Sequence, residues 1–497
     1  MSDGSSYRQI LRSSSIIGGA SVVNVLVGLV RIKAAAVLLG PAGVGLIGLL
    51  QSLMTTAATL AALGFGNVGT RQIAEAVGMG DPSALAAVRR ALFLGTLILA
   101  LLGALAVWLA RDLLTAQVLE GAVRPGDLGW LAVGVALMVA AGSQVALLNG
   151  LRRITDLAWI TVGSALLSTL LGVAALLLWG VGGVAAFVAA APLASFLLGH
   201  WYVARLEPVR GPPTPLSQLL GHWGRLARLG AAFMLSGLVT TLSLLVARTL
   251  VQRELGAEAL GHFQAAWMIG MTYIGFVLSS MGTDYYPRLT AAIQDRAAAN
   301  RLVNEQTEVA LLLGGPVFLA MQGLAPWVVQ LLYSGDFDEA TWILRWQLLG
   351  DVLKVASWPL GFVILAAGDG RTFLLTESAS SGIFVLLLWL GLPLFGIQTS
   401  GVAFLIMYML YLPLVHRLVS RRTGFAWSRR VMVSLAVLAG LASMVFICAL
   451  WSFQAAAILG LVAAAALALY ALARLARMAD LSGPVARLAG AGRGFMI

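Results

Sequence analysis

The chain has 497 residues, of which 60% are hydrophobic and 11% are charged. Soluble globular proteins are about 45–50% apolar and about 25% charged, so this composition excludes a water-soluble enzyme. The only cysteine, Cys448, excludes an internal disulfide and an iron–sulfur cluster, and the four histidines show no metal-ligand spacing. We therefore expect an all-α polytopic membrane protein that carries no cofactor and no metal.

Fourteen apolar runs along the chain are long enough, at about 18 residues or more, to cross a bilayer as helices. The first run is too long for the apolar region of a signal peptide and lacks a clear cleavage site, so we interpret it as a retained first helix. The predicted transmembrane helices cover residues 14–39, 44–66, 89–110, 129–149, 158–179, 182–203, 229–252, 259–282, 308–333, 341–367, 371–392, 397–419, 430–452 and 455–475.

The basic residues test this count, because cytoplasmic loops of membrane proteins collect Arg and Lys. With both termini and every even-numbered loop assigned to the cytoplasm, these segments hold 24 of the 32 basic residues. The opposite loops hold only Arg111, Arg124 and Arg253. The net charge of +11 thus reflects membrane topology and does not indicate a nucleic-acid partner.

The two halves of the chain show weak, collinear similarity. Leu39–Gly45 aligns with Leu255–Gly261 at an offset of 216, and Arg31 then falls one residue out of register with Arg248. Chance is the alternative explanation, since Leu, Ala and Gly are abundant. The further anchors, at offsets of 217 and 218, are Arg71 with Arg288, Gly150 with Gly368, and Gly183 with Gly401.

Two copies of a six-helix unit explain this pattern. Because six is even, both copies enter the membrane from the same side, as parallel repeats of a transporter around a central cavity. Two extra helices follow the second copy. We expect an N-lobe (helices 1–6), a cytoplasmic linker, a C-lobe (helices 7–12), and helices 13–14 with a cytoplasmic tail, at residues 1–205, 206–228, 229–420 and 421–497.

Several short, glycine-rich segments resemble a known superfamily. They are Arg31-Ile32-Lys33, Leu39-Gly40-Pro41-Ala42-Gly43-Val44-Gly45-Leu46, Gly64-Phe65-Gly66-Asn67 before Arg71, and Tyr285-Tyr286-Pro287-Arg288-Leu289. With them, the chain resembles the multidrug/oligosaccharidyl-lipid/polysaccharide exporter superfamily, and more narrowly the bacterial O-antigen and lipid III flippases. The resemblance implies a two-lobed bundle that moves polyprenyl-diphosphate-linked sugars across the inner membrane by alternating access. Fourteen helices also fit the lipid II flippases, whose last two helices form a groove for the lipid tail.

Five basic residues fall inside predicted helices, namely Arg31, Lys33, Arg248, Arg345 and Lys354. Only two acids, Asp351 and Glu377, accompany them, which leaves a surplus of three positive charges. A charge at bilayer depth costs at least ~2.5–3.5 kcal/mol, so it normally faces a cavity or a partner. A cavity that receives a diphosphate would use the surplus, because the planar Arg side chain binds phosphate oxygens bidentately. We therefore expect these five residues to bind substrate.

For Arg31, Arg248 and Lys33, the position in the helix decides whether a structural interpretation competes with substrate binding. Arg31 lies nine residues before Gly40, which is about 13 Å inside the helix end, so its charge would reach the interface only with strain. Arg248 lies eight residues before Gly256 and is its repeat counterpart. Lys33 is about 200° around the helix from Arg31 and nearer the end, so snorkelling to the interface explains it equally well.

The remaining charges also have competing interpretations. Arg345, close to the start of its helix, is well placed as an interfacial anchor beside Trp342 and Trp346. Asp351 and Lys354 are three residues apart on one helical face, as either a neutralising pair or a gate whose pairing changes. Glu377 is protonated, couples transport to protons, or pairs with Lys354, and we favour pairing.

We therefore expect a flippase for a polyprenyl-diphosphate-linked oligosaccharide with a cationic cavity, and not an enzyme. It would act as a monomer in the bacterial inner (cytoplasmic) membrane, with both termini cytoplasmic. A polysaccharide polymerase and its chain-length machinery are candidate partners beside the lipid-linked glycan and the bilayer.

Three alternatives remain open. They are a lipid II flippase, a multidrug or cation exporter of the same superfamily, and a membrane-embedded polyprenyl-glycan polymerase or ligase. A cation exporter would place net negative charge in its cavity. A polymerase needs long outer loops with catalytic residues, which the longest outer loop, residues 111–128, lacks.

Overall fold

The computed structural model describes residues 3–207 and 215–478, and this part of the chain is helical with no strand. The linker residues 208–214 and the tail from residue 479 lie outside the described residues. The helices are α1 (Asp3–Ala62), α2 (Phe65–Gly78), α3 (Pro82–Leu109), α4 (Arg111–Gln117), α5 (Leu128–Gly150), α6 (Ile154–Trp179), α7 (Val184–Ala204), α8 (Leu216–Ala292), α9 (Arg296–Leu332), α10 (Asp338–Ala366), α11 (Gly370–Phe395), α12 (Thr399–Thr423), α13 (Arg429–Trp451) and α14 (Phe453–Met478).

All fourteen predicted runs fall on helices, although not one run to each helix. α1 and α8 carry two runs each, whereas α2 and α4 carry none. Within the described residues, ten helical stretches are long and apolar enough to span a membrane, and four of these are 43 to 54 residues long. A stretch of 45 residues extends about 67 Å, roughly twice the hydrocarbon thickness of a bilayer. Each of the four therefore holds two of the predicted spans.

A glycine with positive φ breaks each of these four long stretches. Gly40 (φ 63°) divides α1 and Gly256 (φ 84°) divides α8. Gly180 (φ 55°) separates α6 from α7, and Gly396 (φ 62°) separates α11 from α12. Glycine adopts this conformation without the steric penalty that a Cβ imposes. The breaks within each pair are 216 residues apart, which agrees with the offset of the first repeat anchor.

Two later sequence anchors, Gly150 with Gly368 and Gly183 with Gly401, have an offset of 218, whereas the positive-φ residues of the two halves are 216 apart. In the turn after α5 the positive φ belongs to Arg152 (57°), and in the turn after α10 it belongs to Gly368 (75°). These two are again 216 residues apart. The backbone therefore pairs Gly368 with Arg152, whereas the sequence pattern pairs it with Gly150. Glycine abundance explains the difference, because a Gly–Gly match can be found near almost any register.

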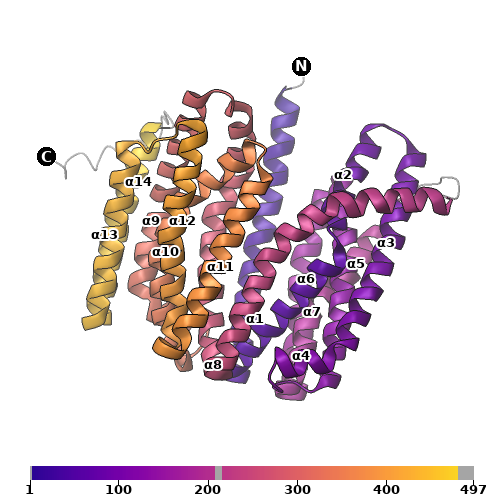
Figure 1. Ribbon diagram of the computed structural model, residues 1–497, viewed down its shortest axis with the longest axis horizontal. Helices are drawn as coiled ribbons and strands as arrows, with labels where there is room; N and C mark the ends of the chain where they lie inside the picture. Colours follow the sequence, from indigo (N-terminus) through magenta and orange to yellow (C-terminus); the bar gives the residue numbers. More distant parts are fainter. Residues whose placement is uncertain (1–2, 208–214, 479–497) are drawn as a thin grey trace. The chain divides into compact units, whose positions relative to one another are not determined.

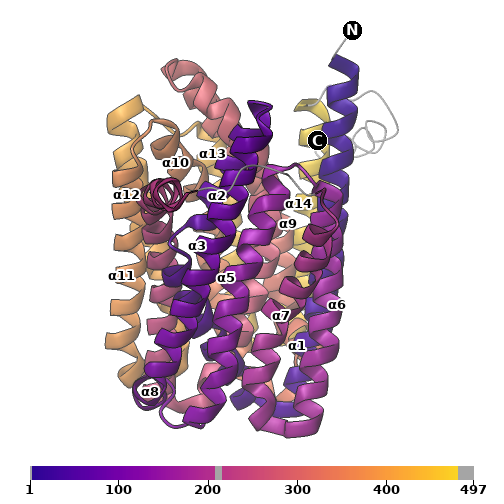
Figure 2. The same ribbon diagram turned by 90° about the vertical axis from the view of Figure 1, so that its right-hand side faces the viewer.

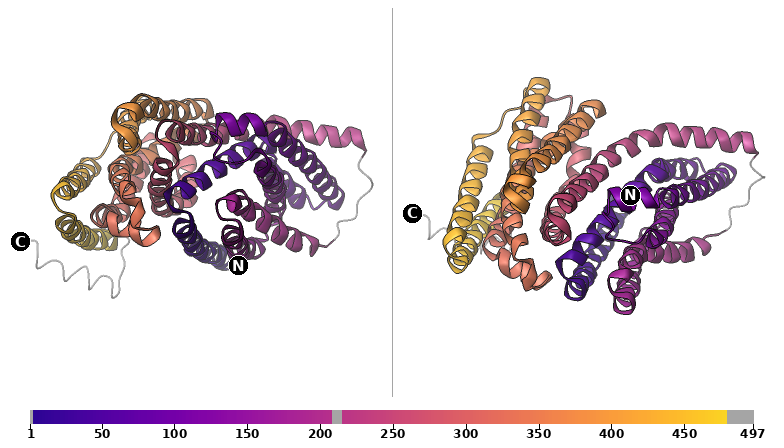
Figure 3. Two further views of the ribbon diagram at one scale, coloured as in Figure 1. Left: turned by 90° about the horizontal axis from the view of Figure 1, so that it is seen from below. Right: turned by 60° about the horizontal axis from the view of Figure 1, so that its bottom comes forward.

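The described chain packs as two compact units, Met1–Gly261 and His262–Ile497. In the first unit, α5 packs against α2, α3 and α7, and α6 packs against both α1 and α7. Figure 2 shows α3, α5 and α6 running in the same general direction. The long α8 begins in this unit (Figure 3). There, Trp223 donates a hydrogen bond from Nε1 to the Ala91 carbonyl on α3 (2.8 Å), and Leu226 packs beside Phe65. The lobe boundaries expected from the repeat are not the same as this division, and they stay a prediction.

In the second unit, α10 is the central element. It packs against α9, α12 and α13, and most of its length is buried. The α13–α14 hairpin lies along α9, with α14 in the more extensive contact (Figure 1). Gly323 of α9 and Gly460 of α14 allow this approach, because a Cβ on Gly460 would lie 2.8 Å from the Leu319 carbonyl.

We expect Gly256→Ala to lower the free energy of unfolding by ~1–3 kcal/mol, because φ 84° with ψ −178° is a conformation nearly confined to glycine. No atom lies within 4 Å of the added Cβ, so the cost comes from the backbone alone. Denaturant unfolding of the purified protein in detergent measures it. Gly440→Ala in α13, which also meets open space, is the control and should be neutral or stabilising. Equal stability of the two variants would contradict the strain argument.

A second expectation concerns pH. Asp369 caps α11 by accepting hydrogen bonds from Thr372 N (2.9 Å) and Thr372 Oγ1 (2.6 Å), and it also accepts one from Arg422. These bonds, those from Thr372 foremost, lower the pKa of Asp369 from 3.8 to about 2. Since the folded pKa lies below the unfolded value, this stabilisation is complete above the unfolded pKa and is lost as the pH falls towards 2.

We therefore expect Asp369→Asn to flatten the acid limb of the stability curve. The wild type should lose unfolding free energy between pH 4 and pH 2 faster than the variant, because only the wild type must protonate a bonded carboxylate. Thr372→Ala, which removes one of the two Thr372 donors, should fall between them. Parallel curves for all three proteins would show that this cap does not titrate with folding.

Candidate functional site

Arg31 is held inside the first unit by neutral groups. Its NH1 donates to Ser168 Oγ on α6 (3.3 Å) and its NH2 donates to the Phe187 carbonyl on α7 (2.5 Å), with the guanidinium 4.3 Å from the centre of the Phe187 ring. Its Nε is buried without a partner. No carboxylate within the described residues forms an ion pair with it. The protein therefore orients this cation without neutralising it.

Arg248 is treated in the same way. It is 5% exposed, and its NH1 donates to Ser52 Oγ on the second arm of α1, while its Nε lacks a partner. No carboxylate in the described part of the chain forms an ion pair with Arg248 either. The matching contacts of Arg31 and Arg248 with hydroxyls support their treatment as a pair.

The two kinks place Arg31 and Arg248 at comparable depth. Arg31 is nine residues before Gly40 and Arg248 is eight before Gly256, or about 13 and 12 Å along their helices. The kinks themselves meet, since a Cβ on Gly45 would lie 2.7 Å from the Ala257 carbonyl. Lys33 is half-buried on the same arm as Arg31. All three residues therefore lie in the first unit. Arg31 and Lys33 are on the part of α1 before Gly40, and Arg248 is on the part of α8 before Gly256.

The intramembrane charges divide unequally between the units. The seven predicted spans of the first unit contain Arg31, Lys33 and Arg248 away from their ends, and no Asp or Glu. The spans of the second unit contain Arg345 and Lys354 with Asp351 and Glu377. The surplus of three positive charges that the sequence revealed thus belongs entirely to the first unit.

Asp351 lies at the centre of a polar cluster in the second unit. It is fully buried on α10, and it accepts a hydrogen bond from the hydroxyl of Tyr273 on α8 while its Oδ1 has no partner. Lys354, one turn further along α10, lies within hydrogen-bonding range of Met271 Sδ (3.7 Å) and faces the rings of Phe404 and Tyr408.

The expected pairing of Lys354 with Glu377 is replaced by another contact. Tyr411 Oη donates to Glu377 Oε1 (2.6 Å), and no ion pair within 4 Å joins Lys354 to either acid. Both carboxylates still act on the ammonium at longer range. Tyrosine hydroxyls satisfy the acids here because they reach without the desolvation that a close ammonium would require.

Arg345 differs from the interfacial anchor that its position suggested. It is fully buried between α9, α10 and α14, with Nε donating to the Gln322 carbonyl (3.3 Å). The guanidinium lies 5.0 Å from the ring centres of both Trp342 and Phe453, and its NH1 and NH2 lack hydrogen-bond partners. Packing of the α13–α14 hairpin over α10 covers a side chain that would otherwise reach the interface.

The neutral partners of these charges escaped the sequence reasoning. Ser52, Ser168, Tyr273 and Tyr411 lie within apolar helices. A Ser hydroxyl there commonly bonds a carbonyl of its own helix, so the two serines gave no signal. The available signal was rarity, since the chain has only nine tyrosines. Tyr273 and Tyr411 lie well inside predicted spans, away from the ends where Tyr usually marks the interface.

Comparison with known proteins adds two kinds of information. A family model described as polysaccharide biosynthesis protein matches residues 10–292. The lipid III flippases of Escherichia coli (strain K12) and Shigella flexneri are each 26% identical to this chain over 416 residues, which is 82% of this chain and 97% of each relative.

Solved structures share the fold. The lipid II flippase MurJ in an inward closed conformation aligns with a TM-score of 0.69 at 12% identity, covering 95% of this chain and all of that one. An inward-facing multidrug resistance MATE transporter of the MOP superfamily aligns with a TM-score of 0.68 at 17% identity, covering 81% of this chain and 94% of that one. The expected all-α, polytopic membrane fold is thereby confirmed, and the chain belongs to the polysaccharide biosynthesis protein family.

Proposed function

We propose that the protein is a flippase that carries a polyprenyl-diphosphate-linked oligosaccharide from the cytoplasmic to the periplasmic leaflet of the bacterial inner membrane. The observation that carries this proposal is that Arg31 and Arg248 lie in spans with no acid, and that neither forms an ion pair within the described residues. The similarity to lipid III flippases over 82% of the chain supports it.

A diphosphate is the ligand class that these side chains fit. Each guanidinium has five N–H donors. The hydrogen bonds of Arg31 use two of them, and the hydrogen bond of Arg248 uses one. The remaining donors suit phosphate oxygens, which Arg binds bidentately through charge-assisted hydrogen bonds. Anion binding would also supply the negative charge that the predicted spans of the first unit lack.

Transport would proceed by alternating access, with the polar head in the cationic site and the polyprenyl chain in lipid. The chain has no G-x-x-x-x-G-K-[ST] phosphate loop, so nothing in it indicates ATP as the energy source. An interior-negative membrane potential favours outward transfer of an anion by ~2.3 kcal/mol per charge per 100 mV. We place both termini in the cytoplasm, following the charge distribution of the loops.

The polar cluster of the second unit is the proposed gating or coupling element. With both acids ionised, Asp351, Lys354 and Glu377 have a net charge of −1. Each acid accepts a hydrogen bond from a tyrosine hydroxyl and forms no ion pair with the lysine. A gate needs charges that exchange partners at small cost. Movement of Tyr273 or Tyr411 would release a carboxylate towards Lys354.

The alternatives differ in what they require. A cation or drug exporter needs a site with net negative charge. The predicted spans of the first unit instead contain basic residues and no acid. A lipid II flippase also carries a diphosphate, so the charges favour it equally, and only the sugar attached to the transported lipid distinguishes the two.

We expect Arg31→Ala and Arg248→Ala each to reduce flipping by about 10- to 100-fold, since one charge-assisted phosphate contact contributes ~1.5–3 kcal/mol. The assay follows a polyprenyl-diphosphate-linked glycan across the membrane of proteoliposomes, with insertion checked by quantifying reconstituted protein. Two variants are the controls. Ser52→Ala removes the hydroxyl that accepts a hydrogen bond from Arg248 but keeps the arginine charge. Arg253→Ala removes an arginine in an outer loop that is bonded to Gln117. Full transport by both Arg variants would exclude the cationic site.

We further expect Tyr273→Phe to lower the free energy of unfolding by ~1–3 kcal/mol, because a fully buried carboxylate then loses its donor. Tyr411→Phe is the matched control, since Glu377 is only half-buried and water can replace the lost bond. If the cluster gates transport, the flipping rate per folded Tyr273→Phe molecule should also fall. A purely structural cluster would lower stability and leave that rate unchanged.

A further inference from the structure

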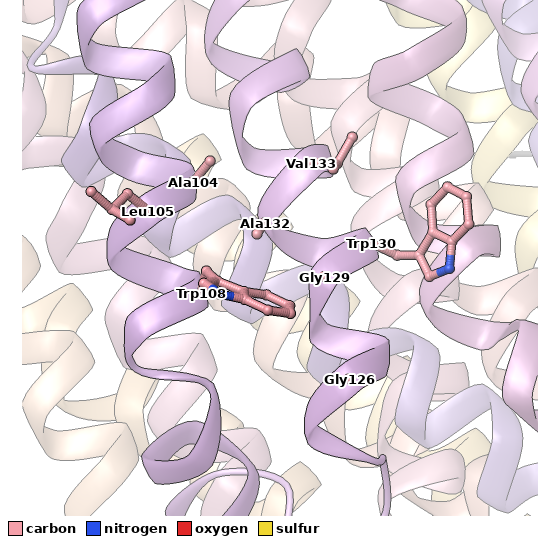
Figure 4. Close-up of a pocket in the computed structure, with 8 residues that line it drawn as sticks. All are labelled: Ala104, Leu105, Trp108, Gly126, Gly129, Trp130, Ala132 and Val133. Carbon is pink, nitrogen blue, oxygen red and sulfur yellow. The ribbon is translucent and has the colours of Figure 1, made fainter.

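Two hollows adjoin at the end of the first unit that the loop charges assign to the outside. One is an apolar groove of about 660 Å³ between α3 and α5, with a floor of small residues and with Trp108 and Trp130 beside it. Figure 4 shows the Trp108 ring lying between the two helices, over Gly129. A Cβ on Gly129 would lie 3.2 Å from this ring, so the absence of a side chain there keeps the groove open.

The second hollow, of about 570 Å³, is polar and shares Trp130 with the first. It is lined by Arg124 and Asp127 and by residues around the α6–α7 turn. Arg124 is exposed, and no ion pair within 4 Å joins it to Asp127 in the described chain. The hollow therefore presents one positive and one negative group side by side, both available to a ligand.

A single short segment separates the two environments. Gly126 and Gly129 line the apolar groove, whereas Arg124 and Asp127 line the polar hollow. Trp108, Trp130 and Trp179 at this end are 42%, 50% and 59% exposed, as is usual for Trp at a membrane interface. Both volumes lie in the range of about 300–1,000 Å³ that small-molecule sites occupy.

We propose that these hollows together bind one phospholipid with a zwitterionic, primary-amine headgroup, of the phosphatidylethanolamine class. Its phosphate contacts Arg124, its ammonium contacts Asp127, and one acyl chain lies in the groove between α3 and α5. Charge complementarity selects this occupant, because an anionic headgroup without an amine would leave Asp127 facing a phosphate. The site is separate from Arg31 and Arg248 and does not depend on the proposed transport activity.

Native mass spectrometry of the full chain, released from detergent and titrated with phosphatidylethanolamine or phosphatidylglycerol of identical acyl chains, tests the proposal. The wild type should bind the ethanolamine lipid more tightly. Arg124→Gln should weaken this binding by roughly three- to tenfold, as expected for one partly exposed charge contact. Asp127→Asn should remove the preference by weakening only the ethanolamine lipid.

The groove has its own variant. Gly126→Leu meets no protein atom within 4 Å of its Cβ, so the protein should fold while the side chain fills the groove and weakens both lipids. Gly440→Leu on α13, also in open space, should bind both lipids as the wild type does. Tighter binding of phosphatidylglycerol by the wild type, or unchanged binding by Arg124→Gln and Gly126→Leu, would overturn the proposal.

Discussion

The hydrocarbon core of a membrane offers no water to a backbone N–H or C=O, and this constraint governs the whole chain. Every span must be helical, and at four of its reversals this chain leaves the helix only briefly. The four glycines at 40, 180, 256 and 396 meet that requirement with positive φ angles of 55–84°. Because the break is so short, helical hydrogen bonding resumes at once and 45-residue stretches read as one helix.

The same scarcity of water makes each intramembrane charge informative. In the second unit, tyrosine hydroxyls donate to Asp351 and Glu377, while Arg345 is held by a carbonyl and two aromatic rings. In the first unit, serine hydroxyls and a carbonyl orient Arg31 and Arg248 but add no negative charge. Neutral holders of this kind keep a cation in place while leaving its field available.

Apolar run length and loop charge were sufficient to predict the fold, because both follow directly from the bilayer. All fourteen runs lie on helices, and the amphipathic α2 and short α4 were missed since neither spans. The charged residues of the site could be named from sequence for the same reason. Their partners could not, because the contact of Arg31 with Ser168 joins residues 137 positions apart. Arg345 shows the limit clearly, since only the packing of α14 distinguishes a buried cation from an interfacial one.

The 216-residue spacing of the glycine breaks has a consequence for how this chain diverged. Carried through that spacing, Ser168 corresponds to Phe384, Phe187 to Ala403 and Ser52 to Met268. The turns are thus shared between the halves, whereas the two serine hydroxyls that hold the arginines occur in the first half alone. A scaffold with repeated backbone breaks can therefore keep its reversals in both halves while the side chains of one half alone change.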